Sequence, residues 1–410
     1  MRGFTTRAIH GGTSRKDGYG ALRMPVYDSV AFEHESAEAI RLAFEGKKPA
    51  HTYSRISNPT VEDFEQRLRL LSGGLAVLAL SSGMAAISNT ILALAGSGTN
   101  IVASRFLFGN TMSLLEKTLR PWGLEIRLVN MTRPQEVAGA IDSATRLIFM
   151  ESVTNPQLEV ADCRKIAAIA ADSAVPLVVD NTLMTPYLFN VREAGGNIEL
   201  LSTTKYISGG ATSVGGVIID HGNFNWRNAP RMKETARNLG QMAFMASLRR
   251  EIFRNVGSCI SPHNAYLQSL GLESMGLRID RSCENALALA NFLARQSGVA
   301  AVNYPGLADS PAFTVANRQF RGKFGGLLTF DLHSGEACRS FIDALQLIRR
   351  ATNVNDNKSL ILHPASTLFA EYTEAEKSVM AVRPTMLRLS VGIEDHEDLI
   401  EDLERGLKEL

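Results

Sequence analysis

This chain of 410 residues has almost no excess of one charge over the other, and its apolar runs are short. Its 43 basic and 42 acidic residues are spread evenly and give a net charge of +1, which favours neither nucleic acid nor a membrane as a partner. No apolar run is long enough to span a bilayer, and residues 1–12 lack the apolar core of a signal peptide. We therefore expect a cytoplasmic protein.

Patterns that bind metals are also missing. The four cysteines have neither metal-site nor redox-pair spacing, which favours a reducing compartment. The eight histidines form no zinc motif of the His-Glu-x-x-His type. The sequence therefore predicts no metal centre, and any chemistry has to come from side chains or an organic cofactor.

Three segments differ in their pattern of apolar residues. Residues 1–60 are rich in turns and poor in periodicity, so we expect an arm that packs on another part of the molecule or on a partner. In residues 61–255 strand-like runs alternate with helical stretches, which predicts a mostly parallel sheet covered by helices. Residues 256–410 open with a helical stretch at about 264–297 and predict a smaller α/β domain.

A lysine follows one of the predicted buried strands. The apolar run 198–201 leads into Ser202, Thr204 and Lys205 and then into a glycine-rich turn. Burial would lower the pKa of this amine and make it a nucleophile toward an aldehyde cofactor. The two hydroxyl groups could bind a phosphate. Taken alone, the pattern is more typical of a solvated lysine.

A carboxylate follows another predicted strand. The run 175–179 ends in Asp180, and ligands of open α/β sheets gather at the carboxyl ends of the strands. Asp180 and Lys205 would then face one crevice. A pyridoxal phosphate site needs such a pair, a lysine to hold the cofactor and an acid to keep its pyridine nitrogen protonated. By itself Asp180 could equally be a turn or helix-cap residue.

Two further motifs could bind a phosphate. Ser82, Gly83 and Met84 follow a predicted strand and open a helix, where backbone N–H groups and a glycine favour a bound anion. Tyr53 and Arg55 stand shortly before an Asn-Pro pair, and the planar fork of arginine matches a phosphate. Separately, these segments would be an ordinary helix cap and a surface turn.

Together these motifs resemble the Cys/Met-metabolism family of pyridoxal-phosphate enzymes. The resemblance covers nearly the whole chain and includes the segments 6–12, 53–60, 151–156, 202–210, 271–278, 363–367 and 388–394. It implies an α/β chain of fold type I, like aspartate aminotransferase, with pyridoxal 5'-phosphate as cofactor. It also implies a homo-oligomer, a tetramer built from dimers in which Tyr53 and Arg55 reach the neighbouring subunit's site.

The resemblance assigns roles to further residues. Asn155 matches the asparagine near the cofactor's phenolic oxygen, and Arg388 the arginine that binds the substrate α-carboxylate. Arg388 could otherwise be a surface residue on an edge strand, although its neighbours are apolar. Ser359 is a second candidate for the same carboxylate, and Tyr53 could also contact the substrate.

Phe108 departs from the family pattern, which usually has a tyrosine that stacks on the cofactor ring and assists the leaving group. Phenylalanine keeps the stacking surface but has no proton to donate. A carboxylic acid with a pKa of about 4–5 leaves unaided, whereas a thiol near 8.5 does not leave as readily. General-acid help is worth about two to four orders of magnitude in rate. The substitution therefore favours an ester substrate, unless Tyr53 supplies the proton.

The leading hypothesis is γ-replacement on O-acetylhomoserine in methionine biosynthesis, with homocysteine as product. The sulfur donor would be sulfide, a small thiol or a sulfur-carrier protein. A methionine or cystathionine γ-lyase and a cystathionine γ-synthase are the enzymatic alternatives. The non-enzymatic alternative is a catalytically silent binding protein with the same fold.

Overall fold

A seven-stranded sheet forms the centre of the larger part of the molecule. The computed structural model describes residues 2–12 and 19–410. The strands follow the order β1-β7-β6-β5-β4-β2-β3. Their bounds are β1 (Ala76–Leu80), β2 (Asn100–Ser104), β3 (Glu125–Val129), β4 (Thr145–Glu151), β5 (Leu177–Asp180), β6 (Ile198–Leu201) and β7 (Gly216–Asp220). Strand β7 pairs antiparallel with β1 and β6, and the other pairs are parallel, which confirms the predicted sheet type.

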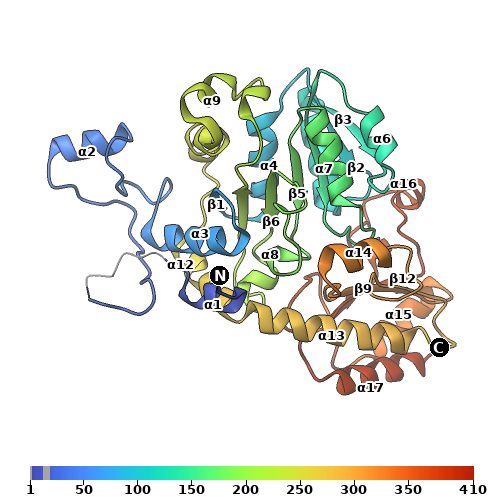
Figure 1. Ribbon diagram of the computed structural model, residues 1–410. Helices are drawn as coiled ribbons and strands as arrows, with labels where there is room; N and C mark the ends of the chain where they lie inside the picture. The colour runs from blue at the N-terminus through green and yellow to red at the C-terminus, as the bar shows by residue number, and fades with distance from the viewer. Residues whose placement is uncertain (1, 13–18) are drawn as a thin grey trace.

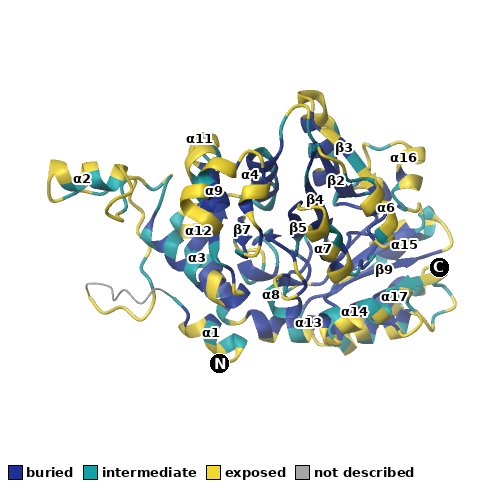
Figure 2. Cartoon of the chain, turned by 45° about the horizontal axis from the view of Figure 1, so that its top comes forward, coloured by how far each residue is buried: buried dark blue, intermediate teal, exposed yellow. Residues whose placement is uncertain are grey.

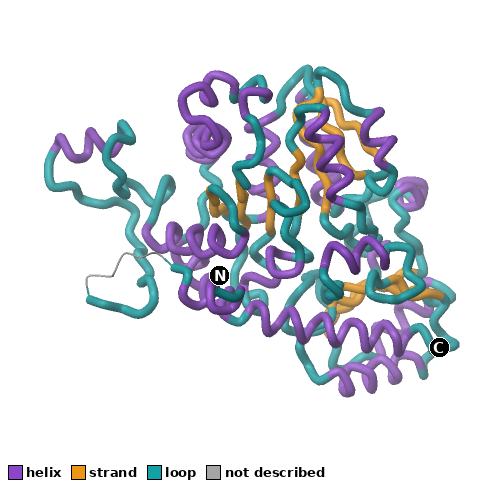
Figure 3. The backbone as a smooth tube through the Cα atoms, in the orientation of Figure 1, coloured by secondary structure: helices purple, strands orange, loops and turns teal. Residues whose placement is uncertain are grey.

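Both faces of this sheet are buried over its central strands, because residues that alternate along these strands enter two different apolar cores, whereas the edge strand β3 is partly exposed. Val77 and Val179 belong to one core, whereas Leu78 and Val178 belong to the other. Helices lie on both sides of the strands (Figure 3). Burial on both faces explains why the strands read as continuous apolar runs in the sequence.

The helices of this part are short, apart from the two that lead into and out of β1. They are α3 (Pro59–Ser72), α4 (Gly83–Leu94), α5 (Gly109–Ser113), η1 (Leu114–Leu119), η2 (Arg120–Trp122), α6 (Pro134–Gly139), α7 (Cys163–Asp172), α8 (Thr185–Leu188), η3 (Tyr206–Ser208), η4 (Trp226–Asn228), α9 (Lys233–Leu239), η5 (Gly240–Met242), α10 (Ala243–Ser247), η6 (Leu248–Phe253) and α11 (Arg254–Val256).

The C-terminal part is built on a second sheet of five strands in the order β10-β11-β12-β9-β8. Its elements are α14 (Phe313–Phe320), α15 (Gly335–Ala344), η7 (Pro364–Ser366), α16 (Glu374–Val379), α17 (His396–Leu407), β8 (Ala301–Asn303), β9 (Leu327–Asp331), β10 (Arg349–Arg350), β11 (Leu360–Leu362) and β12 (Met386–Ser390). The long helical stretch predicted at 264–297 is two helices, α12 (Pro262–Glu273) and α13 (Met275–Leu293). They separate at Ser274, whose N–H bonds the nearby carbonyl of Leu272 instead of continuing the helical pattern.

The N-terminal segment contains α1 (Phe4–His10) and α2 (Ala37–Phe44). Helix α1 packs against α3, whereas α2 projects away from both sheets (Figure 1) and has no buried residue. The exposed surface of α2 contrasts with the buried strands in Figure 2. The division at residues 60 and 255 stays a prediction. Within residues 2–12 and 19–410, no helix is long and apolar enough to cross a membrane.

Candidate active site

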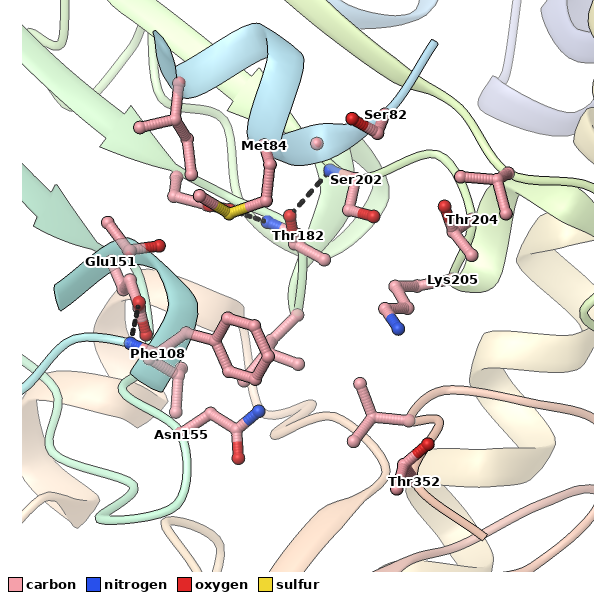
Figure 4. A pocket seen from close by; sticks show the side chains of 18 of the residues that line it. Ser82, Met84, Phe108, Glu151, Asn155, Thr182, Ser202, Thr204, Lys205 and Thr352 are labelled. Atoms are coloured by element: carbon pink, nitrogen blue, oxygen red, sulfur yellow. Dashed lines mark hydrogen bonds between the residues drawn. The ribbon is translucent and has the colours of Figure 1, made fainter. Parts of the chain in front are cut away.

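A cavity of about 240 Å³ opens where the strands of the large sheet end and the second sheet begins. It brings together ten of the thirteen predicted site residues, namely Ser82, Gly83, Met84, Phe108, Asn155, Asp180, Ser202, Thr204, Lys205 and Arg388. They come from six separate segments of the chain, at 82–84, 108, 155, 180, 202–205 and 388. Those labelled in Figure 4 surround one space. The other lining residues are Ile87, Thr111, Glu151, Val153, Thr182, Leu183, Val214, Thr352 and Val354.

Lys205 lies just past the end of β6, and its amine reaches the loop that follows β10. The Nζ group donates to Asn353 Oδ1 at 2.6 Å, and Asn353 Nδ2 donates to Asp356 Oδ2 at 3.0 Å. Burial, assisted by the charge of Arg388, lowers the pKa of Lys205 to about 8, and Asp356 acts in the opposite direction. The amine is therefore far closer to its neutral, nucleophilic form than an ordinary lysine.

Asp180 ends β5, and Glu151 lies directly opposite it on β4. The backbone N–H of Thr182 donates to Asp180 Oδ1 at 3.0 Å. Burial raises the pKa of Asp180, and burial together with Asp180 raises that of Glu151 well above its ordinary value. Two buried carboxyl groups in register favour a single negative charge, and the greater rise in the pKa of Glu151 favours its location on Asp180.

The start of α4 approaches Ser202 closely. Ser82 is the N-cap, and its Oγ accepts from the N–H of Ala85 at 3.1 Å. A Cβ atom on Gly83 would lie 2.7 Å from Ser202 Cβ, so only glycine permits this approach. The first N–H groups of α4 have no acceptor within the helix, and they line the same cavity as Ser202 and Thr204. This arrangement suits a phosphate.

Arg388 is a buried guanidinium on β12, with 2% of its surface exposed. It donates to Asn155 Oδ1 at 3.1 Å and to the carbonyl oxygens of Thr352 and Asn353 at 3.1 and 3.3 Å. Among the described residues no carboxylate pairs with it, and its Nε is buried without a partner. Burial lowers its pKa to about 10. A buried guanidinium without a counter-charge is suited to bind a carboxylate.

Tyr53, Arg55 and Ser359 do not line the cavity. Arg55 donates to the carbonyl of Arg254 and lies over the ring of Tyr53, which is 41% exposed. Their predicted place in a neighbouring subunit stays a prediction. The hydroxyl of Ser359 donates to Glu394 at 2.9 Å and accepts from the N–H of Gly392. Both hydrogen bonds hold Ser359 within a buried loop that does not line the cavity.

Sequence reasoning missed Glu151, Asn353 and Asp356. Glu151 belongs to the segment 151–156, on which the family resemblance partly rests, but no role was predicted for this residue. Asn353 and Asp356 belong to a run of polar residues between two short strands of the second sheet, and this density of amide and acid side chains was the available signal.

Comparison with known proteins agrees with this geometry. The family model described as Cys/Met metabolism PLP-dependent enzyme matches residues 5–408. The chain belongs to this family. Its cofactor is pyridoxal phosphate, and a Campylobacter jejuni structure, provisionally named O-acetylhomoserine (thiol)-lyase, contains N'-pyridoxyl-lysine-5'-monophosphate. That structure is 32% identical, with a TM-score of 0.94, and the match covers 99% of this chain and 100% of the other.

Two further relatives are named for two different activities. L-Methionine gamma-lyase of Pseudomonas putida is 38% identical over 410 residues, which are 100% of this chain and 98% of the relative. A solved O-acetylhomoserine sulfhydrylase of the methionine biosynthetic pathway of Wolinella succinogenes is 46% identical, with a TM-score of 0.79. The match covers 99% of this chain and 100% of that one.

Proposed function

We propose that this protein catalyses γ-replacement on O-acetylhomoserine in methionine biosynthesis. The Cγ–O bond breaks and releases acetate, and a Cγ–S bond forms with sulfide to give homocysteine. The observation that carries the proposal is Phe108, whose ring faces the cavity without a proton to donate (Figure 4). Acetate leaves as an anion unaided, whereas the thiol of a γ-lyase reaction benefits from a general acid.

The cavity residues fit the cofactor. When bound, pyridoxal phosphate supplies an electron-withdrawing ring that acidifies the substrate's Cα and Cβ protons. Asp180 would hold the negative charge beside the ring nitrogen. The start of α4, Ser202 and Thr204 would hold the phosphate.

Lys205 and Arg388 would act on the amino acid itself. The lowered pKa of the Lys205 amine suits it to hold the cofactor covalently and, once released, to move protons at Cα and Cβ. Arg388 would bind the α-carboxylate and fix the orientation of the bonds that react.

The acyl group that suits the cavity is uncharged. Lys205 and Arg388 are the cationic residues among those that line it, and both already have roles. Among the residues that the structure describes, no cation of this cavity is left to bind the second carboxylate of a succinyl ester or the charge of a phosphoryl ester. Burial of an unpaired anion is costly, which supports acetyl.

The arm would complete the site in a homo-oligomer, with Tyr53 and Arg55 contacting the phosphate of the neighbouring subunit. Lys205→Ala and Arg55→Ala chains should both be inactive alone. Mixed after reversible dissociation, they should regain activity at about a quarter of the sites, because half of the dimers are hybrid and each has one intact site. A mixture that stays inactive would contradict a shared site.

The decisive assay supplies O-acetylhomoserine and sulfide and measures homocysteine, with Lys205→Ala as the control. Methionine is tested alone at the same concentration. The γ-lyase alternative, which the Pseudomonas relative favours, predicts rapid formation of 2-oxobutyrate from methionine and little homocysteine. No homocysteine above the control would end the proposal.

A further inference from the structure

Glu151 is the last residue of β4 and forms part of the cavity wall, with 7% of its surface exposed. The proposed function gives it no role. A buried carboxyl group with no cationic partner is costly, and an apolar side chain of similar size would fill the space at lower cost. Its contacts therefore need an explanation.

The first contact is to the main chain of the residue that faces the cavity. Glu151 Oε1 accepts from the N–H of Phe108 at 2.6 Å (Figure 4). Phe108 is the N-cap of α5, and its own side chain cannot accept a hydrogen bond there. The carboxyl group of Glu151 thus ties the start of α5, and with it the Phe108 ring, to the rigid central sheet.

The second contact is to the loop that holds the buried arginine. The backbone N–H of Asn155 acts on the same carboxyl group, since it opposes the rise in the pKa of Glu151. The side chain of Asn155 in turn accepts from Arg388 at 3.1 Å. One carboxyl group therefore accepts a hydrogen bond from the loop that carries the aromatic ring, and it interacts with the loop that contacts the guanidinium.

We propose that Glu151 is a positioning residue that holds the Phe108 ring against the cofactor and holds Asn155 where it orients Arg388. The N–H of Phe108 needs an oxygen acceptor rather than a charge. Burial and the neighbouring Asp180 favour the neutral form of Glu151, which leaves the negative charge to Asp180. The inference rests on the proposed function in one respect, that Phe108 faces the bound cofactor.

The experiment compares Glu151→Gln, Glu151→Ala, Phe108→Ala and the double variant Glu151→Ala/Phe108→Ala, all loaded with pyridoxal phosphate. The readouts are the visible circular dichroism of the bound cofactor, its dissociation constant, and kcat and KM. Glu65→Ala is the control, since Glu65 is a half-buried acid, paired with Arg249, that accepts the backbone N–H of Ala79 at 2.8 Å but does not line the cavity.

We expect Glu151→Gln to stay within about threefold of the wild type, because the amide oxygen still accepts from the N–H of Phe108. Glu151→Ala should reduce the cofactor's dichroism and lower kcat about 100-fold, the typical cost of a small misplacement of reacting groups. If Glu151 acts largely through Phe108, the double variant loses little more than the more severe single variant.

Unchanged dichroism in folded Glu151→Ala protein would overturn the proposal, even if its thermal stability fell. Losses that multiply fully in the double variant would overturn the role of Glu151 in holding the Phe108 ring. An effect of Glu65→Ala on the dichroism equal to that of Glu151→Ala would overturn the proposal as a whole. The dichroism needs only the cofactor. A failure of the sulfhydrylase assay is therefore distinguishable from a failure of this inference.

Discussion

The lowered pKa of Lys205 predicts how fast the cofactor-free protein captures pyridoxal phosphate. Only the neutral amine attacks an aldehyde. With a pKa of about 8 rather than the ordinary 10.5, about one amine in eleven is neutral at pH 7, instead of about one in three thousand. Capture at pH 7 should therefore be about 300-fold faster than by an ordinary lysine of equal access.

The charges of Arg388 and Asp356 act on the pKa of Lys205 in opposite directions, so removing either one should change the capture rate in a known direction. Asp356→Asn removes the negative charge that raises the pKa of Lys205, so the pKa should fall and capture at pH 7 should become faster. The gain is limited to about elevenfold, because the amine is then fully neutral. Arg388→Gln removes a charge that lowers the pKa, so capture at pH 7 should slow while the rate at high pH is kept.

Stopped-flow absorbance of the forming covalent product, followed from pH 6 to 11, measures these rates. The titration of pyridoxal phosphate itself is common to all variants, so the comparison between them isolates Lys205. A wild-type rate that still rises steeply above pH 9.5 would refute the reasoning. Identical pH profiles for the wild type, Asp356→Asn and Arg388→Gln would refute it equally.

Three further changes test other parts of the cavity. Arg388→Lys should raise the KM for the amino acid about 10- to 100-fold, because an ammonium cannot reproduce the fork of a guanidinium, and steady-state kinetics measures it. Gly83→Ala should weaken cofactor binding at least about tenfold in equilibrium dialysis, since its Cβ would meet Ser202. The control is Gly139→Ala, where a Cβ meets nothing within 4 Å, and it should leave cofactor binding unchanged. Phe108→Tyr should increase 2-oxobutyrate formation from methionine by up to about 100-fold, and an unchanged rate would count against its role beside the leaving group.

The large-sheet half of the site was predictable because its chemistry follows strand ends. Asp180 and Lys205 each follow an apolar run, and the ends of neighbouring parallel strands meet at one edge. Asn353 and Asp356 were not predictable in this way. They lie on a loop of the second sheet, and their contact with Lys205 depends on how the two sheets pack, which no local pattern encodes. The break at Ser274 was missed for a related reason, since the helical pattern continues on both sides of it.

The division of residues between the two sheets has a consequence for the chemistry. The large sheet supplies Asp180 and the lysine, whereas Arg388 and Asp356, the two charges that tune the Lys205 amine, both come from the C-terminal part. Any shift of that part relative to the large sheet would change the distances of both charges from the amine at once. Binding of a substrate carboxylate by Arg388 would neutralise the charge that lowers the Lys205 pKa, and so raise the basicity of the amine at the moment when it has protons to accept.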